Sequence, residues 1–165
     1  QGATFEIYLP VVAAPVSDET SAAADPAQHG EASILFVDDE PAVTELAAHV
    51  LGELGYRVHG YTSSKAALRA FEADPDAFDL VITDQMMPGL TGDKLVQAIR
   101  AVRCDVPILL GTGYSEVITP EGARELGIAE VFYKPITPRQ LADLVQKTLA
   151  PHAAGASKSP PVASA

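Results

Sequence analysis

Short apolar runs alternate along the chain with segments in which apolar residues recur every three or four positions. A short apolar run is typical of a strand buried on both faces, and the longer spacing is typical of a helix with one face in the core. The more polar run at 56–61 suits an edge strand. The predicted strands are residues 34–37, 56–61, 80–83, 107–111 and 130–133.

Helix-start signals follow each predicted strand. Pro41 fits a first helical turn, Ser63 or Ser64 fits a cap, and Gly92 precedes the third helix. The last two helices are expected to begin at Thr119-Pro120 and Thr137-Pro138. The apolar stripe of the first helix is predicted to comprise Val43, Leu46, Ala47, Val50, Leu51 and Leu54. That of the third is predicted to comprise Leu95, Val96, Ile99 and Val102.

The alternation of strands and helices predicts an α/β fold, because right-handed βαβ units build a doubly wound parallel sheet. We assign this domain to residues 32–150. Residues 13–31 are rich in Ala, Pro, Ser and acidic side chains, which favours an acidic flexible linker. Residues 151–165 have a similar low-complexity composition and are expected to form a disordered tail.

Composition narrows the function classes. The net charge of −11 argues against unaided nucleic-acid binding, because phosphates would repel the chain. Cys104 is the only cysteine, which excludes an internal disulfide and, without a secretory pattern at the start, favours a cytoplasmic setting. No apolar run approaches the roughly 20 residues that a membrane span requires, so direct membrane insertion is not expected.

Polar residues follow the first, third, fourth and fifth strands: Asp38 with Asp39, then Asp84, Thr112 and Lys134. In a parallel sheet these strand ends meet at one edge, where ligands bind. Clustered carboxylates repel unless a cation lies among them, and Mg²⁺ prefers few carboxylates with several waters. Together with a lysine and a hydroxyl, the set suits a phosphoryl group, with Asp84 as the nucleophile.

Taken singly, these residues also have ordinary structural interpretations. Asp84 alone suits a turn cap, and the Asp38-Asp39 pair suits a helix N-terminus. Lys134 alone suits a surface charge. Five coordinated placements at strand ends favour a site over chance.

The joint pattern resembles the receiver domain of two-component response regulators. The segments that carry the resemblance are residues 37–40, 83–89 with Gly92, 111–113, and 134–135. It implies a flavodoxin-like (βα)5 doubly wound sheet in the order 2-1-3-4-5, with the site between strands one and three. It also implies a partner, either a phosphohistidine-bearing kinase or a histidine phosphotransfer domain.

The resemblance further implies a role for each site residue. Asp84 corresponds to the phosphoacceptor. Asp39, Asp84 and the Met86 backbone carbonyl correspond to direct Mg²⁺ ligands, and Asp38 to a ligand through water.

Two further positions complete the implied switch. Thr112 corresponds to the hydroxyl that moves toward the phosphoryl group, and Lys134 to the ammonium that pairs with it; Lys134-Pro135 is frequently cis in the family. Val131 stands where many receivers carry Tyr or Phe, which puts the aromatic part of the switch in doubt. Met86 and Tyr114 flank the predicted site, and we expect them to screen the acyl phosphate from water.

Residues 1–10 are similar to the last strand of a histidine-kinase ATP-binding domain. With Gln rather than Met at position 1, we expect a piece of a hybrid sensor histidine kinase (EC 2.7.13.3), with residues 1–12 as the remnant of its kinase domain. Two rival functions remain: a phosphatase with an aspartyl nucleophile, and a pseudo-receiver that only docks. The phosphatase reading lacks its second acid, because Met86 stands two residues after Asp84.

Overall fold

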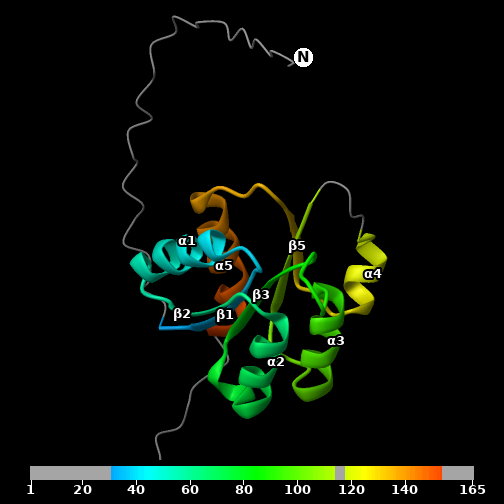
Figure 1. Cartoon of the computed structure of the whole chain (residues 1–165). Helices are drawn as coiled ribbons and strands as arrows, with labels where there is room; N and C mark the ends of the chain where they lie inside the picture. Colours follow the sequence, from blue (N-terminus) through cyan, green and yellow to red (C-terminus); the bar gives the residue numbers. More distant parts are fainter. Residues whose placement is uncertain (1–30, 114–117, 154–165) are drawn as a thin grey trace, which may run out of the picture.

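The structure is a computed structural model that describes residues 31–113 and 118–153. Within those residues, five strands alternate with five α-helices (Figure 1). A short 3-10 turn, η1 (Pro75–Ala77), precedes the third strand. The elements are β1 (Ser33–Val37), α1 (Pro41–Glu53), β2 (Arg57–Tyr61), α2 (Ser64–Ala73), β3 (Leu80–Asp84), α3 (Gly92–Val102), β4 (Ile108–Thr112), α4 (Pro120–Glu125), β5 (Glu130–Tyr133) and α5 (Pro138–Ala153).

The strands form one parallel sheet in the order β2-β1-β3-β4-β5, which confirms the predicted order and the edge position of β2. In this register Asp84 pairs with Gly111, and Thr112 pairs with Tyr133. The chain reverses its direction of winding between β1 and β3, the place at which open α/β sheets bind ligands.

Helices cover both faces of the sheet (Figure 1). One core lies between the sheet and α1 with α5, and it includes Ile34, Phe36, Leu51 and Val145. The other lies between the sheet and α2, α3 and α4, and it includes Leu35, Val37, Phe71, Leu95 and Ala123. Because successive strand residues face opposite sides, Val131 packs on the second core and Phe132 on the first, as predicted.

The helix signals are confirmed in detail. The Ser63 hydroxyl accepts a hydrogen bond from the Ala66 N–H, and Thr119 accepts one from the Gly122 N–H. Thr137 and Gln140 bond reciprocally at the start of α5, with 2.9 Å from the Thr137 N–H to Gln140 Oε1. Gly127 adopts φ +69° just past α4, a conformation that favours glycine.

Two stripe predictions were wrong. Leu46 is 54% exposed and Val102 is 44% exposed. α1 instead buries Thr44, Ala47 and Leu51, which places Leu46 on the flank of the helix rather than against the sheet. Val102 is the last residue of α3, where the helix leaves the core.

The domain limits stay predictions. α5 runs to Ala153, three residues past the expected boundary at 150, and the rest of the predicted tail lies outside the described residues. The proposed kinase remnant and acidic linker lie outside them too, apart from residue 31. No described helix is long and apolar enough to cross a membrane.

Candidate phosphoacceptor site

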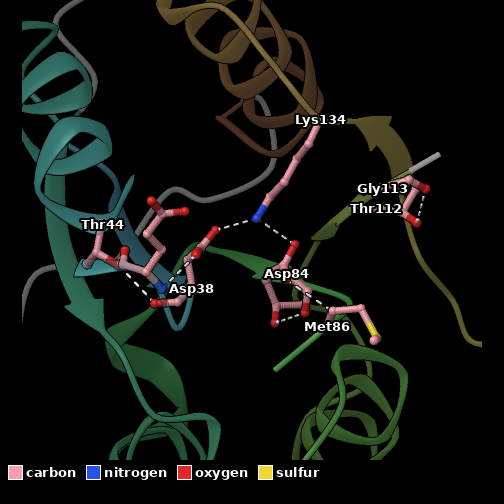
Figure 2. Close-up of polar contacts among 9 residues, drawn as sticks. Asp38, Thr44, Asp84, Met86, Thr112, Gly113 and Lys134 are labelled. Carbon is pink, nitrogen blue, oxygen red and sulfur yellow. Dashed lines mark hydrogen bonds and ion pairs between the residues drawn. The ribbon is translucent and has the colours of Figure 1, made fainter. Parts of the chain in front are cut away.

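Lys134 bridges two buried carboxylates at the carboxyl edge of the sheet (Figure 2). Its Nζ lies 2.6 Å from Asp38 Oδ2 and 2.6 Å from Asp84 Oδ1. Asp38 is 2% exposed and Asp84 is 8% exposed, so both acids are shielded from bulk water. Three residues from the ends of β1, β3 and β5 therefore meet at a single ammonium group.

Asp38 is held from both ends of its side chain and by its backbone. Its Oδ1 accepts a hydrogen bond of 3.0 Å from the Glu40 N–H, and its carbonyl accepts one of 3.1 Å from the Thr44 hydroxyl. Its own N–H donates to the Tyr61 carbonyl of β2. The carboxylate can reorient little, since the Glu40 N–H holds one of its oxygens and Lys134 the other, while Thr44 and Tyr61 fix the Asp38 backbone.

Asp84 occupies the last position of β3. Its Oδ2 accepts a hydrogen bond of 3.0 Å from the Met86 N–H, while Oδ1 faces Lys134 (Figure 2). Met86 itself is exposed, whereas Met87 is buried in the core beside α3. The loop after β3 thus turns one methionine into the core and leaves the other beside the phosphoacceptor candidate.

The electrostatics of Lys134 balance two opposing effects. Burial, the largest single effect, lowers the pKa of the Lys134 ammonium. The hydrogen bonds and negative charges of Asp38 and Asp84 together outweigh burial and raise that pKa above its ordinary value. Lys134 is therefore a firm positive charge at neutral pH. The Lys134-Pro135 bond is cis, which confirms the expectation from the sequence.

Thr112 is buried at the end of β4, on the side of Asp84 away from Asp38 (Figure 2). Its hydroxyl donates to the Gly113 carbonyl over 3.3 Å, and its own carbonyl accepts from the Lys134 N–H over 2.9 Å. Thr112 therefore flanks the carboxylate pair from the end of the neighbouring strand. Val131 is half-buried against the core of α3 and α4. Tyr114 lies outside the described residues.

The carboxylate oxygens at this site are the type of ligand that a hard divalent cation prefers. Mg²⁺ commonly uses one or two carboxylates together with waters, and Asp38 and Asp84 already converge on one cationic group. Asp39 is exposed, and the described residues contain no cluster of three Asp, Glu, His or Cys side chains that could hold a metal ion. The structure thus joins Asp38, Asp84 and Lys134, and leaves Asp39 beside them.

Beneath Lys134 lies a mostly apolar cavity of about 60 Å³ between α1, α5 and the sheet. Leu46, Phe132 and Ile136 are among its lining residues, as are Asp38 and Asp84. A carbon atom added at Gly111 would lie 2.8 Å from Phe132 Cζ and 3.5 Å from Lys134 Cε. Gly111 therefore leaves the space through which the lysine side chain crosses β4.

Sequence reasoning missed two groups near the site. Thr44 is a polar residue on the buried stripe of α1, three positions before Ala47. A polar residue at an apolar position of the helical pattern could have marked it as a candidate. The second is a pair of side chains, Gln85 and Asp93, that bond across the β3–α3 loop. No sequence signal marks that pair, because it depends on the path of the loop.

Comparison with known families decides the identity. A sequence profile described as the response regulator receiver domain matches residues 34–146. The chain belongs to the response regulator receiver domain family. It is a CheY-like receiver domain of two-component signalling, and the predicted resemblance to that family is confirmed.

Relatives of this receiver domain include both regulators and sensor kinases. The chain is 34% identical over 132 residues to the response regulator protein FleR of Pseudomonas aeruginosa. The aligned region covers 80% of this chain and 28% of FleR. It is 31% identical over 160 residues to the sensor kinase CckA of Brucella abortus, covering 90% of this chain and 17% of CckA. The chain thus spans a minor part of these relatives.

Solved structures give the same fold. A receiver domain from Clostridium thermocellum superposes with a TM-score of 0.70 at 27% identity, covering 74% of this chain and 98% of that one. The receiver domain of the hybrid histidine kinase CckA superposes with a TM-score of 0.60 at 32% identity, covering 71% and 98%. Receiver domains generally bind Mg²⁺ for phosphorylation, and those in hybrid kinases and response regulators interact with kinases or phosphotransfer partners.

Proposed function

We propose that Asp84 of this receiver domain accepts a phosphoryl group from a phosphohistidine in a Mg²⁺-dependent reaction. The observation that carries the proposal is the Lys134 ammonium, 2.6 Å from a carboxylate oxygen of both Asp84 and Asp38. A nucleophilic carboxylate beside a fixed ammonium and a second acid is the arrangement that phosphoryl transfer requires.

The transfer exchanges one bond to phosphorus for another. An oxygen of Asp84 forms the new O–P bond, giving an acyl phosphate, while the N–P bond of the phosphohistidine breaks. The bonding electron pair stays with the imidazole nitrogen, and the imidazole takes up one proton from solvent to become a neutral histidine. Lys134 stays protonated, because Asp38 and Asp84 hold its pKa above the ordinary value.

Asp38, Asp39, Asp84 and the Met86 carbonyl are the groups that would hold Mg²⁺. When bound, the ion neutralises negative charge on the carboxylates and on the phosphoryl oxygens. Asp38 is already fixed by the Glu40 N–H and by Thr44, so its oxygens need little reorganisation. Asp39 is exposed next to it.

Thr112 and Lys134 would receive the phosphoryl oxygens. Thr112 flanks Asp84 at the neighbouring strand end, and its hydroxyl now donates to the Gly113 carbonyl. Rotation of that hydroxyl toward the acyl phosphate supplies the switch. Val131 follows without an aromatic ring, so we expect the signal to pass through backbone movement of β4 and β5 rather than through a ring rotation.

The partner follows from this chemistry. We expect a kinase with a phosphohistidine or a histidine phosphotransfer domain as donor, in the cytoplasm, where a reduced Cys104 is stable. The similarity to the sensor kinase CckA favours a hybrid histidine kinase as the parent protein. Phosphotransfer profiling against candidate donors, with Asp84→Asn as the negative control, would identify the cognate one.

The deciding experiment uses a small phosphodonor. Incubation with acetyl phosphate and Mg²⁺ should label the chain at one phosphoryl group per molecule, and Asp84→Asn should abolish the label. Asp143→Asn, which changes an exposed acid on α5, is the matched control and should label normally. Multiple turnover of the donor would favour the phosphatase, and complete absence of labelling would favour the docking-only pseudo-receiver.

A further inference from the structure

We propose that Gln85 and Asp93 form a clamp that positions the β3–α3 loop at the phosphoacceptor. Gln85 Nε2 donates to Asp93 Oδ1 over 3.1 Å, and the Asp93 N–H donates to Gln85 Oε1 over 3.1 Å. The two bonds run in opposite directions between the same residues, so they fix the orientation of the Gln85 amide as well as its position.

The backbone of Gln85 reinforces the clamp. Its N–H donates to the Gly111 carbonyl of β4 over 2.8 Å, and its carbonyl accepts from the Gly92 N–H over 2.9 Å. Gln85 therefore makes four hydrogen bonds, which tie the end of β3 to β4 and to the first turn of α3. Gly92 permits this closure, because a side chain there would collide with the Asp84 carbonyl.

The clamp holds both ends of a six-residue loop, residues 86–91. Met86 is the first residue of that loop, and its N–H donates to Asp84 Oδ2 over 3.0 Å. Any shift of Gln85 or of the start of α3 would move the Met86 main chain relative to the carboxylate. Gln85 and Asp93 are thus positioning residues: they act on Asp84 through the Met86 backbone.

Asp93 is suited to this role at neutral pH. A hydrogen bond from the Thr91 side chain lowers the pKa of the Asp93 carboxyl, and the bond from Gln85 lowers it further. The carboxylate is therefore an acceptor for the Gln85 amide under working conditions. Residues that orient a metal ligand without touching the metal commonly change affinity by 10–100-fold when replaced.

The inference rests on the proposed function, because it assigns the Met86 main chain to the same Mg²⁺ and phosphoacceptor site. Its first readout is nevertheless independent of phosphorylation. In metal-free protein, amide hydrogen exchange of Met86 should accelerate about tenfold in Gln85→Met, since that variant keeps the side-chain length and loses both clamp bonds. Asp93→Asn should exchange like the parent protein, because its side-chain oxygen still accepts from Gln85.

The second readout is magnesium binding followed by amide chemical shifts. Gln85→Met should raise the Mg²⁺ concentration for half-saturation about tenfold, and Asp93→Asn should leave it within about twofold of the parent. The control is Gln97→Met, the same replacement at an exposed position of α3, which should change neither readout. If Gln85→Met does not fold, Asp93→Leu, which removes the acceptor alone, carries the test.

Equal rates of Met86 amide exchange in Gln85→Met and the parent would overturn the clamp. An equal acceleration of that exchange in Gln97→Met would overturn it too. These outcomes are separate from failure of the proposed function. If the parent chain takes no label from acetyl phosphate, the phosphoacceptor assignment falls, while Met86 exchange still decides whether the clamp positions the loop.

Discussion

Lys134 Nζ and Asp38 Oδ2 lie 2.6 Å apart although 96 positions separate these residues in the sequence. Lys134 follows β5 at one edge of the sheet, and Asp38 follows β1 on the far side of β3 and β4. The pair therefore forms only when β1, β3, β4 and β5 lie side by side in the sheet. Formation of the site therefore depends on the pairing of these four strands.

Removal of the Lys134 charge should be costly. Lys134→Met leaves two buried carboxylates next to each other without a cation. We expect a loss of about 2–4 kcal/mol in the free energy of unfolding, somewhat below the range for fully buried pairs because the lysine is partly exposed. Urea denaturation at neutral pH measures this loss.

The control for that variant is Lys147→Met. It removes an exposed ion pair with Glu130 on the surface, where the expected cost is about 0–1 kcal/mol. Adding Asp84→Asn to Lys134→Met should recover part of the stability, since one of the two repelling charges disappears. Similar small losses for both lysine variants would contradict a stabilising role for the Lys134 bridge.

Gly111→Ala should destabilise the domain, because the added methyl group overpacks the space beside Phe132 and Lys134. The new Cβ would lie 2.8 Å from Phe132 Cζ and 3.5 Å from Lys134 Cε. We expect a loss of about 1–3 kcal/mol in unfolding free energy, as for other overpacked core positions. Thermal or chemical denaturation measures it, and Phe132→Leu in the same chain should reduce the loss, because the smaller side chain vacates the contact.

Gly113→Ala is the neighbouring control for that experiment. A Cβ at Gly113 would meet nothing within 4 Å, so its effect on stability should be small. If Gly111→Ala lowered the free energy of unfolding as little as Gly113→Ala does, the predicted overpacking against Phe132 and Lys134 would be wrong.

Gly52→Ala should stabilise the domain. Gly52 is an exposed residue of α1, and an added Cβ would meet nothing within 4 Å. Alanine restricts the unfolded chain and favours the helix, so we expect a gain of about 0.5–1 kcal/mol. Gly127→Ala is the opposing control, because φ +69° strains any side chain there and should destabilise. A loss of stability in Gly52→Ala would show that α1 needs the glycine.

Arg100 joins the end of α3 to the segment after α4. Its guanidinium donates to the carbonyls of Cys104, Val106 and Gly127 over 2.8, 2.7 and 2.5 Å. Arg100→Met should cost about 2–4 kcal/mol, since three charge-assisted hydrogen bonds disappear together. The matched control is Arg69→Met, an exposed arginine of α2. Urea denaturation of both variants measures the loss in the free energy of unfolding. A loss in Arg100→Met no larger than in Arg69→Met would contradict the structural role of Arg100.

The resemblance to receiver domains predicted the strand order, and the alternation of apolar runs with helices predicted which residues meet at the sheet edge. Asp38 and Asp84 each come at the end of a buried apolar run, and Lys134 follows the partly exposed strand β5, so the parallel topology brings the three together. Helix caps were equally readable, because Ser63, Thr119 and Thr137 act on the nearest turns.

Other features depended on tertiary packing. Leu46 fits an apolar helical stripe, yet the packed α1 buries Thr44 and leaves Leu46 exposed. The Gln85–Asp93 clamp could not be read, because an eight-residue separation across an irregular loop has no characteristic periodicity. Asp39 is likewise exposed although the adjacent Asp38 is buried, a difference that the acidic pair in the sequence does not reveal.

The bridge of one ammonium between two carboxylates has a further consequence. As a set, Asp38, Asp84 and Lys134 carry a surplus of one negative charge inside a shielded pocket. An anion that arrived without a companion cation would be repelled, and a cation without an anion would gain only partial compensation. From this charge balance we expect Mg²⁺ and a phosphoryl group to bind in the pocket more favourably together than either does alone.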